Sequence, residues 1–192
     1  MQSGIQELAG GIFLIKLPMP FKPKHVNIYL FLEKDGFTLI DTGPNLDGIL
    51  PALEASLAEI GRRVEECRRI WITHHHMDHC GLAGIIAERS GASVHLSETE
   101  EQTIRSYADP GERAARLRRF AAEHGLEPET TETVIRIFSA FRTAASSFNA
   151  SGFLSGGDRL EAGGRAVDVI STPGHSRGHL SFHLPEERLL IA

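Results

Sequence analysis

Apolar positions in the first part of the chain alternate between strand-like runs and helical spacing. Short β-rich runs at 12–17, 26–32 and 37–41 are separated by prolines and by a turn-forming Lys-Asp-Gly, which predicts three strands. Between 46 and 60 the apolar positions follow one helix face, and Gly61 is placed to end that helix.

The same alternation continues in the middle of the chain. A buried strand is predicted at 69–73, a helix at 81–89 and a further short strand at 91–96. Strands that alternate with helices are typical of layered α/β folds. The residues after the strand at 69–73 are therefore expected in a loop at the carboxyl end of a strand, where open α/β sheets usually carry their functional sites.

A helical block at about 97–150 interrupts this sheet pattern. Ser97 and Glu100 have the spacing of a capping box that begins one helix, and Asp109 is placed to cap a second. A third helix is predicted over about 128–148 from its broad apolar face. We interpret the block as a helical insertion.

The carboxyl-terminal part returns to strands. Runs at 158–161 and 165–171 flank an Ala-Gly-Gly turn and predict a hairpin. A turn rich in glycine follows at 172–179, and the apolar run 188–192 predicts the start of another strand.

Composition is that of an ordinary globular domain. With 192 residues, 41% of them hydrophobic and 23% charged, the chain is long enough to fold as a single domain, 1–192. The net charge of -5 disfavours a nucleic-acid partner held by bulk electrostatics. No apolar run approaches the roughly 20 residues that span a bilayer, so no membrane partner is expected. Cys67 and Cys80 form no disulfide framework, which suits a reducing cytoplasm, and nothing marks Cys80 as a nucleophile.

Candidate chemistry concentrates in the loop after the central strand. Four ligand-type side chains stand there within six positions: His74, His76, Asp78 and His79. Neutral imidazole and carboxylate are groups that zinc accepts, and a polar loop whose histidines only bond backbone or water would rarely gather so many. We predict that His74 and His76 converge on one ion. Asp78 and His79 are expected to turn towards a neighbouring point.

The stretch His74-x-His76-x-Asp78-His79 resembles the His-x-His-x-Asp-His signature of the metallo-β-lactamase-fold hydrolases, in a form similar to that of glyoxalase II. Thr172-Pro173-Gly174-His175 resembles the second signature of that family, which implies that His175 is a further metal ligand. The strand that closes on Asp41-Thr42-Gly43 is another point of likeness. The fold implied is α/β, an αββα four-layer sandwich of the metallo-β-lactamase type.

The resemblance covers essentially all 192 residues but lacks the final part of the family pattern. In the family, the strand begun at 188–192 leads to a Gly-Asp whose carboxylate bridges two metals, and then to a last histidine. We therefore expect a fold that is incomplete at the carboxyl terminus. Three imidazoles remain for the first site, so one Zn²⁺ is expected to be strongly held and a second weak or absent, with iron or manganese as alternatives. The missing strands are expected from a longer chain, or from a homo-oligomer or a complementing chain.

The function implied by the resemblance is metal-dependent hydrolysis. A metal-bound hydroxide would attack an ester, thioester or lactone-like small-molecule substrate, and Asp78 is the candidate catalytic residue that orients the water and accepts its proton. Two alternatives stay open, namely a non-catalytic metal-binding scaffold or fragment and a di-iron oxidoreductase of the same fold.

The apolar side chains of the helical insertion are open to two interpretations. In the simpler one its phenylalanines are core and its arginines form a solvated face. In the sharper hypothesis the insertion covers the metal cleft, and Phe141 and Phe148 give that cleft an apolar wall able to accept an acyl group.

Four other polar residues are not predicted to bind metal. Asp41 either orients an imidazole by hydrogen bonding or is a turn aspartate. His95, His179 and His183 are expected to be structural or supporting residues.

Overall fold

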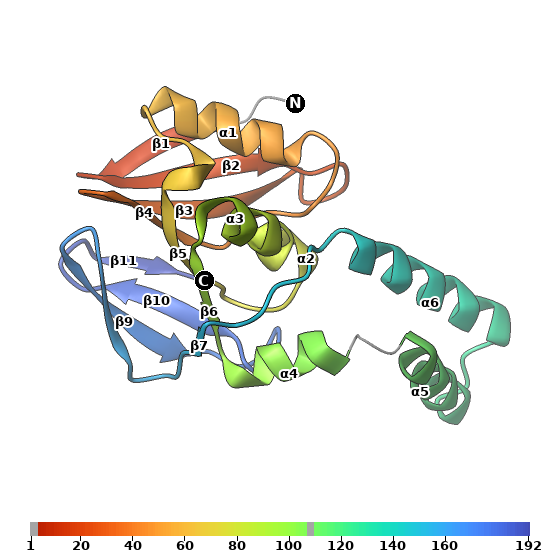
Figure 1. The fold of residues 1–192 in the computed structure, drawn as a ribbon. Coiled ribbons are helices and arrows are strands. Elements are labelled where there is room, and N and C mark those ends of the chain that lie inside the picture. Colours follow the sequence, from red (N-terminus) through yellow and green to blue (C-terminus); the bar gives the residue numbers. More distant parts are fainter. Residues whose placement is uncertain (1–3, 107–109) are drawn as a thin grey trace.

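Two β-sheets packed face to face form the centre of the protein (Figure 1). The computed structural model describes residues 4–106 and 110–192, and the side chains of residues 110 and 140–143 lie outside that description. The strands are β1 (Gly4–Ala9), β2 (Ile12–Pro18), β3 (His25–Glu33), β4 (Gly36–Ile40), β5 (Cys67–Trp71), β6 (Ser93–Leu96), β7 (Gly152–Phe153), β8 (Arg159–Ala162), β9 (Arg165–Ser171), β10 (Leu180–Leu184) and β11 (Leu189–Ile191). One sheet has 7 strands in the order β1-β2-β3-β4-β5-β6-β7, and the other has 4 in the order β11-β10-β9-β8.

Helices cover the face of the 7-stranded sheet that points away from the 4-stranded sheet (Figure 1). The helical elements are α1 (Ile49–Glu59), η1 (Val64–Glu66), α2 (Met77–Cys80), α3 (Ala83–Ser90), α4 (Glu98–Ser106), α5 (Pro110–Glu123) and α6 (Pro128–Thr143). α1 packs against β2, and α3 packs against β5 and β6. This is the α/β arrangement predicted for the metallo-β-lactamase type. α5 and α6 pack on each other and project from the sheets as a helical hairpin (Figure 1).

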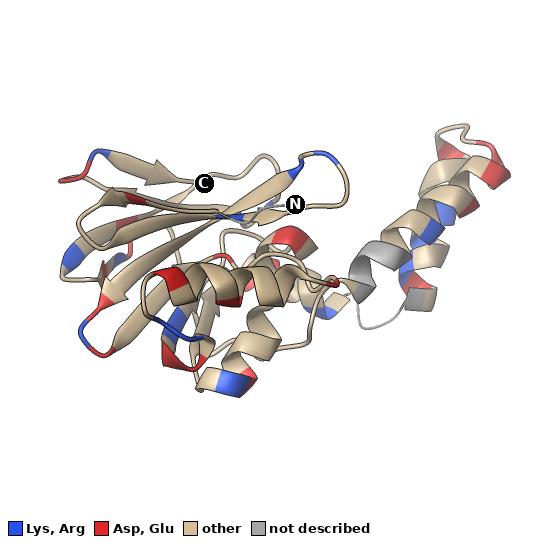
Figure 2. Ribbon diagram, turned by 90° about the horizontal axis from the view of Figure 1, so that it is seen from above, with Lys and Arg blue, Asp and Glu red and all other residues tan. Residues whose placement is uncertain are grey.

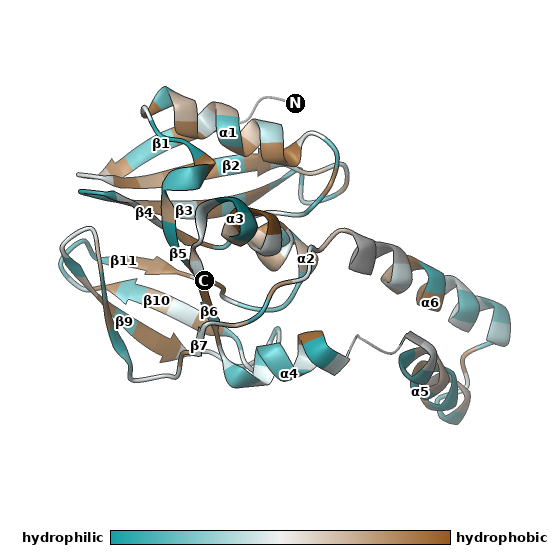
Figure 3. Ribbon diagram, in the orientation of Figure 1, coloured by the Kyte–Doolittle hydropathy of each residue, from teal (hydrophilic) through white to brown (hydrophobic). Residues whose placement is uncertain are grey.

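Successive side chains of the central strands point to opposite faces of the 7-stranded sheet, and both faces are buried. In β4, Phe37 and Leu39 face the helices, whereas Ile40 faces the second sheet. In β5, Ile70 faces the helices and Trp71 the second sheet. Strands covered on both faces have nearly continuous apolar sequences, which is why these two runs are clear in the sequence. Apolar residues accordingly gather along the strands and the inner faces of α1 and α3 (Figure 3).

Parallel pairing of β4 with β5 determines where the functional loops emerge. β1 to β4 pair antiparallel, whereas β4, β5, β6 and β7 pair parallel. Ile40 lies opposite Trp71, and the backbone N–H of Asp41 donates to the carbonyl of Trp71 at 2.9 Å. The loops that follow β4 and β5 therefore leave the same edge of the sheet.

Several predicted boundaries are corrected by the structure. The helix predicted at 46–60 begins at Ile49, because Gly48 has a φ of 83° and is left-handed rather than helical. β1 and β7 are not predicted at all. β1 is mostly exposed and carries little apolar signal, and β7 has only 2 residues.

The helix predicted at 128–148 is wrong at its end, because α6 stops at Thr143. The next residues form a turn and then pass without regular secondary structure across the beginning of α3. Ser146 Oγ donates to the carbonyl of Gly81 at 2.7 Å and accepts the N–H of Gly84 at 3.0 Å. A Cβ on Gly84 would lie 2.2 Å from the Ser147 carbonyl oxygen, so the close approach requires glycine. These tertiary hydrogen bonds, which local apolar spacing does not reveal, end the helix early.

Charged residues lie mainly on helices and near the ends and turns of strands (Figure 2). Arg118 of α5 forms an ion pair with Glu132 of α6 at 2.6 Å, with both side chains about half exposed, as expected for a solvated face. Arg113 instead stacks over the ring of Phe138 at 5.8 Å. Asp109, the predicted helix cap, lies outside the described residues. No helix in the described ranges is both long and apolar enough to cross a bilayer.

We predict that Phe182→Ala destabilises the protein by about 3–5 kcal/mol. Phe182 is fully buried between the sheets and stacks on Trp71 at a centroid distance of 5.6 Å. Urea unfolding followed by circular dichroism should show a lower midpoint. Phe153→Ala is the control, because Phe153 is 52% exposed. Equal urea midpoints for the two variants would contradict the prediction that the core between the sheets contributes more to stability than an exposed phenylalanine does.

Candidate metal centre

Two loops at one edge of the sheets bring three histidines together. His74 and His76 lie between β5 and α2, and His175 lies in the turn between β9 and β10. One nitrogen of each ring lies within 4.8 Å of the other two. His76 Nδ1 is 3.1 Å from His74 Nε2 and 2.9 Å from His175 Nε2. Among the His, Cys, Asp and Glu side chains of the described residues, these three histidines form the group whose ligand atoms lie close enough together to hold a metal ion.

The donor atoms of this cluster fit a cation. A neutral imidazole has one N–H and one lone pair, so His76 Nδ1 can share at most one proton with the two ring nitrogens that it faces. A divalent ion accepts a lone pair from each ring, and three protein ligands leave a tetrahedral zinc one position for water or substrate. His74 Nδ1 lies 3.0 Å from Thr73 Oγ1, and this contact holds the ring with Nε2 towards the cluster.

Burial keeps the predicted ligands in the form that binds metal. Burial, and next the neighbouring His79, lower the pKa of His74 far below its usual value. Burial and the neighbouring His75 lower the pKa of His76 to about 4. Both rings are therefore neutral at neutral pH, and neutral imidazole is the ligand form.

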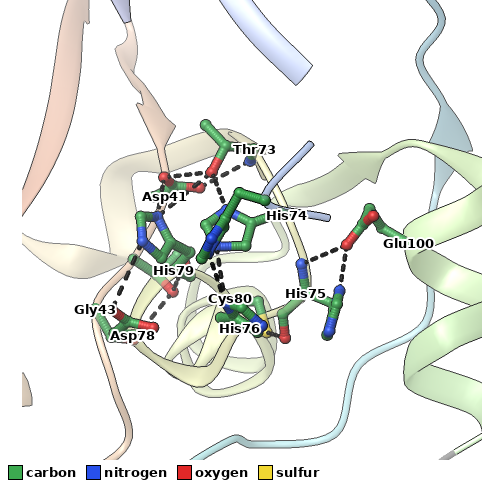
Figure 4. A network of polar contacts seen from close by, with 12 residues as sticks. Asp41, Gly43, Thr73, His74, His75, His76, Asp78, His79, Cys80 and Glu100 are labelled. Atoms are coloured by element: carbon green, nitrogen blue, oxygen red, sulfur yellow. Dashed lines mark hydrogen bonds and ion pairs between the residues drawn. The ribbon is translucent and has the colours of Figure 1, made fainter. Parts of the chain in front are cut away.

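Asp41 follows β4 and hydrogen-bonds an imidazole, as the first of its two interpretations expects. Its buried carboxylate accepts the N–H and the hydroxyl of Thr73, both at 2.8 Å, and lies 2.6 Å from His79 Nδ1 (Figure 4). Burial alone would lower the pKa of His79, but the charge of Asp41 and this hydrogen bond raise it. Asp41 has a φ of 62°, a strained conformation for a residue with a Cβ.

Asp78 and His79 lie beside the three-histidine cluster, at the expected neighbouring point. His79 Nε2 is 3.7 Å from Asp78 Oδ2, and the His79 ring centroid is 4.1 Å from that of His74. Because His79 Nδ1 is occupied by Asp41, its Nε2 is the nitrogen that remains for another partner. The assignment of Asp78 and His79 to a second ion, and of a catalytic role to Asp78, stays a prediction.

The other candidates have structural partners. The Cys80 thiol donates to the His75 carbonyl at 3.2 Å, and burial raises its pKa to about 12, so it is not a nucleophile at neutral pH. His95 contacts Ser93 Oγ at 3.0 Å. The two carboxyl-terminal histidines differ: the His179 ring lies 5.1 Å from His74, whereas His183 lies on β10 and its nearest carboxylate, Asp168, is 4.0 Å away.

Glu100 is a polar residue of the site that sequence analysis assigned only to a helix cap. Its carboxylate accepts the backbone N–H of His75 at 2.9 Å and contacts the ring Nδ1 of the same residue (Figure 4). Burial alone would raise the pKa of Glu100, but hydrogen bonds, the one from the His75 side chain foremost, lower it to about 2. Its spacing to Ser97 is the one local signal, and that signal does not reveal a partner 25 residues away.

A cavity of about 690 Å³ opens beside residues 74–80, which we call the metal loop. Its lining combines residues of that loop with residues of the helical insertion and of the connection between β2 and β3. The lining residues are Phe21, Lys22, Pro23, His75, His76, Met77, Asp78, Cys80, Ile104, Arg113, Phe138, Ala145, Ser146, Ser147 and Phe148. Phe148 therefore lies where the hypothesis of an apolar wall requires it, and Phe138 joins it. The side chain of Phe141 lies outside the described part of the chain.

Comparisons with known proteins identify related chains. A family profile described as the metallo-beta-lactamase superfamily matches residues 22–192. The crystal structure of a metallo-beta-lactamase family protein from Thermus thermophilus is 35% identical, with a TM-score of 0.81 over 97% of this chain and 60% of that one. A probable metallo-hydrolase of Bacillus subtilis is 29% identical over 183 residues, which are 93% of this chain and 55% of the relative. A hydroxyacylglutathione hydrolase of Rhizobium meliloti is 29% identical over 157 residues, 82% of this chain and 42% of the relative. The chain thus spans about half the length of these curated relatives.

We predict that metal-free protein loses stability on acidification partly through His76. The ordinary pKa is 6.5 and the folded value about 4, so between these pH values the unfolded chain takes up a proton that the folded chain does not. The free energy of unfolding should therefore fall as pH drops through this window, by on the order of 1 kcal/mol after allowance for solvent screening. Urea unfolding at pH 7 and pH 4.5 measures it.

In this experiment His76→Gln should lose less stability on acidification than the wild type. His124→Gln is the control, because His124 is exposed and distant from the cluster. An equal loss in the wild type and in His76→Gln would contradict the proposed origin of the pH dependence.

Proposed function

The chain belongs to the metallo-beta-lactamase superfamily, and we propose from the convergence of His74, His76 and His175 that it is the metal-binding part of a hydrolase of ester or thioester bonds. The observation that carries this proposal is the meeting of three ring nitrogens beside a cavity. A non-catalytic metal-binding scaffold would require the three ring nitrogens but not a cavity beside them.

The bound ion is proposed to be zinc, because three imidazoles with one open position are typical of catalytic zinc sites. When bound, such an ion supplies an activated water and polarises the carbonyl under attack. Asp78 lines the cavity with its side chain 26% exposed, and we propose that it orients water and accepts a proton. The hydrogen bond from Asp41 orients the His79 ring, which lies 4.1 Å from the ring of His74.

The proposed substrate carries an apolar acyl group. The cavity volume falls within the roughly 300–1,000 Å³ typical of small-molecule sites. Its apolar lining comes from the insertion, including residues 145–148 after α6, and leads to His76 and Asp78. An acyl chain bound along this lining would therefore place its carbonyl carbon near His76. A relative named for hydrolysis of a hydroxyacylglutathione supports thioesters among the acyl compounds.

We predict that His175→Ala and His74→Ala each lose zinc and hydrolysis together. Removing one of three ligands should weaken zinc binding by at least about 100-fold and lower thioester turnover similarly. Elemental analysis of dialysed protein and a panel of thioester, lactone and phosphodiester substrates measure both effects. His183→Ala is the matched control, since that histidine is on β10 away from the cluster.

Two outcomes of that experiment would contradict the proposal. Wild-type protein that holds zinc but hydrolyses no substrate of the panel would favour a non-catalytic scaffold. Redox-active iron in place of zinc would favour an oxidoreductase of the same fold.

We predict that Phe148→Ala raises KM selectively for substrates with long acyl chains. Loss of an apolar contact with the chain should raise that KM by about 10-fold relative to the KM for an acetyl thioester. Steady-state kinetics with a series of acyl lengths tests this, with exposed Phe153→Ala as control. A uniform loss that follows protein stability would show that Phe148 serves only packing.

A further inference from the structure

Glu100 occupies the third position of α4 but does not complete the capping box that its spacing predicts. Ser97 Oγ accepts the backbone N–H of Glu100 at 3.2 Å, which is one half of that motif. In the other half the glutamate would return to the N–H of Ser97. Its side chain instead turns away from its own helix and towards the metal loop, where it is 1% exposed (Figure 4).

The two carboxylate oxygens of Glu100 bind two different loops. Oε2 accepts the N–H of His75 at 2.9 Å, and His75 stands between the predicted ligands His74 and His76. Oε1 accepts the N–H of Gly178 at 2.6 Å, in the turn that carries His175. One buried group therefore bridges the two segments whose separation determines whether three imidazoles can meet.

The close approach of the His175 turn to α4 depends on a glycine. A Cβ on Gly178 would lie 2.3 Å from Ser97 Oγ and 2.9 Å from Glu100 Oε1. A second link joins the same loops from the strand side, where the N–H of Leu180 donates to the carbonyl of Thr73 at 3.0 Å. With Glu100 on one side and Leu180 on the other, the turn is held at two points against the metal loop.

We propose that Glu100 is a positioning residue, which sets the distance between the His74–His76 loop and the His175 turn and thereby tunes the affinity of the three-imidazole site for metal. The inference rests on the metal site of the proposed function and does not require turnover. A residue that served only to begin α4 would stabilise that helix without affecting the two loops.

Glu100→Gln tests this with little change of volume. The amide keeps one acceptor and places an NH₂ against a backbone donor, so one of the two links must break. We expect zinc and cobalt(II) to bind about 10–100-fold more weakly in direct titrations. We also expect faster amide exchange at His75 or at Gly178, whichever N–H loses its acceptor, with the amides of α4 unchanged.

The neighbouring Glu101→Gln is the matched control. Glu101 lies in the same helical turn and is 8% exposed, but its partner is Arg105. Its replacement should leave metal affinity within about 2-fold. Gly178→Ala should weaken metal binding as Glu100→Gln does, and the double variant should lose less than the product of the two single effects, because both cut the same link.

The inference is overturned if Glu100→Gln weakens metal binding no more than Glu101→Gln does. It is also overturned if amide exchange rises evenly along the chain, which would reveal general destabilisation. A protein that binds zinc and hydrolyses nothing would refute the proposed function, while the comparison of metal affinities would still decide the role of Glu100.

Discussion

The structure depends on one constraint, that three imidazole nitrogens from segments 99 residues apart face a common point. Neutral rings repel one another's lone pairs unless a proton or a cation lies between them, so the arrangement is not one that apolar packing would select. The scaffold holds it from both sides. Parallel pairing of β4 and β5 places the loop of His74 and His76, and packing of the second sheet on Trp71 places the turn of His175.

Two buried carboxylates fix the positions of the residues around the histidines by hydrogen bonding. Asp41 binds Thr73 and His79, and Glu100 binds His75 and Gly178. A buried carboxylate is stable only when its oxygens are satisfied, and each of these accepts at least one backbone N–H and contacts an imidazole. The strained φ of Asp41 fits this view, because such a conformation persists only where the surroundings determine it fully. The result is a rigid polar frame beside a mainly apolar cavity.

Much of this fold could be predicted from the sequence, because the central strands are buried on both faces and the metal loop is chemically dense. The convergence of His175 with His76 was implied only by family resemblance, since residue spacing carries no information on contacts across 99 positions. Two features could not be predicted for a related reason. The end of α6 at Thr143 is set by Ser146 binding Gly81 and Gly84, and the role of Glu100 is set by partners in other loops. Local sequence patterns indicate secondary structure, whereas hydrogen-bond partners in distant segments determine where a helix ends and what a side chain binds.

X-ray absorption at the zinc edge of the metal-loaded protein tests the central claim most directly. The account predicts a first coordination sphere of nitrogen and oxygen at about 2.0–2.1 Å, with the outer scattering of three imidazole rings. A sphere with sulfur from Cys80, or with fewer than three imidazoles, would contradict it.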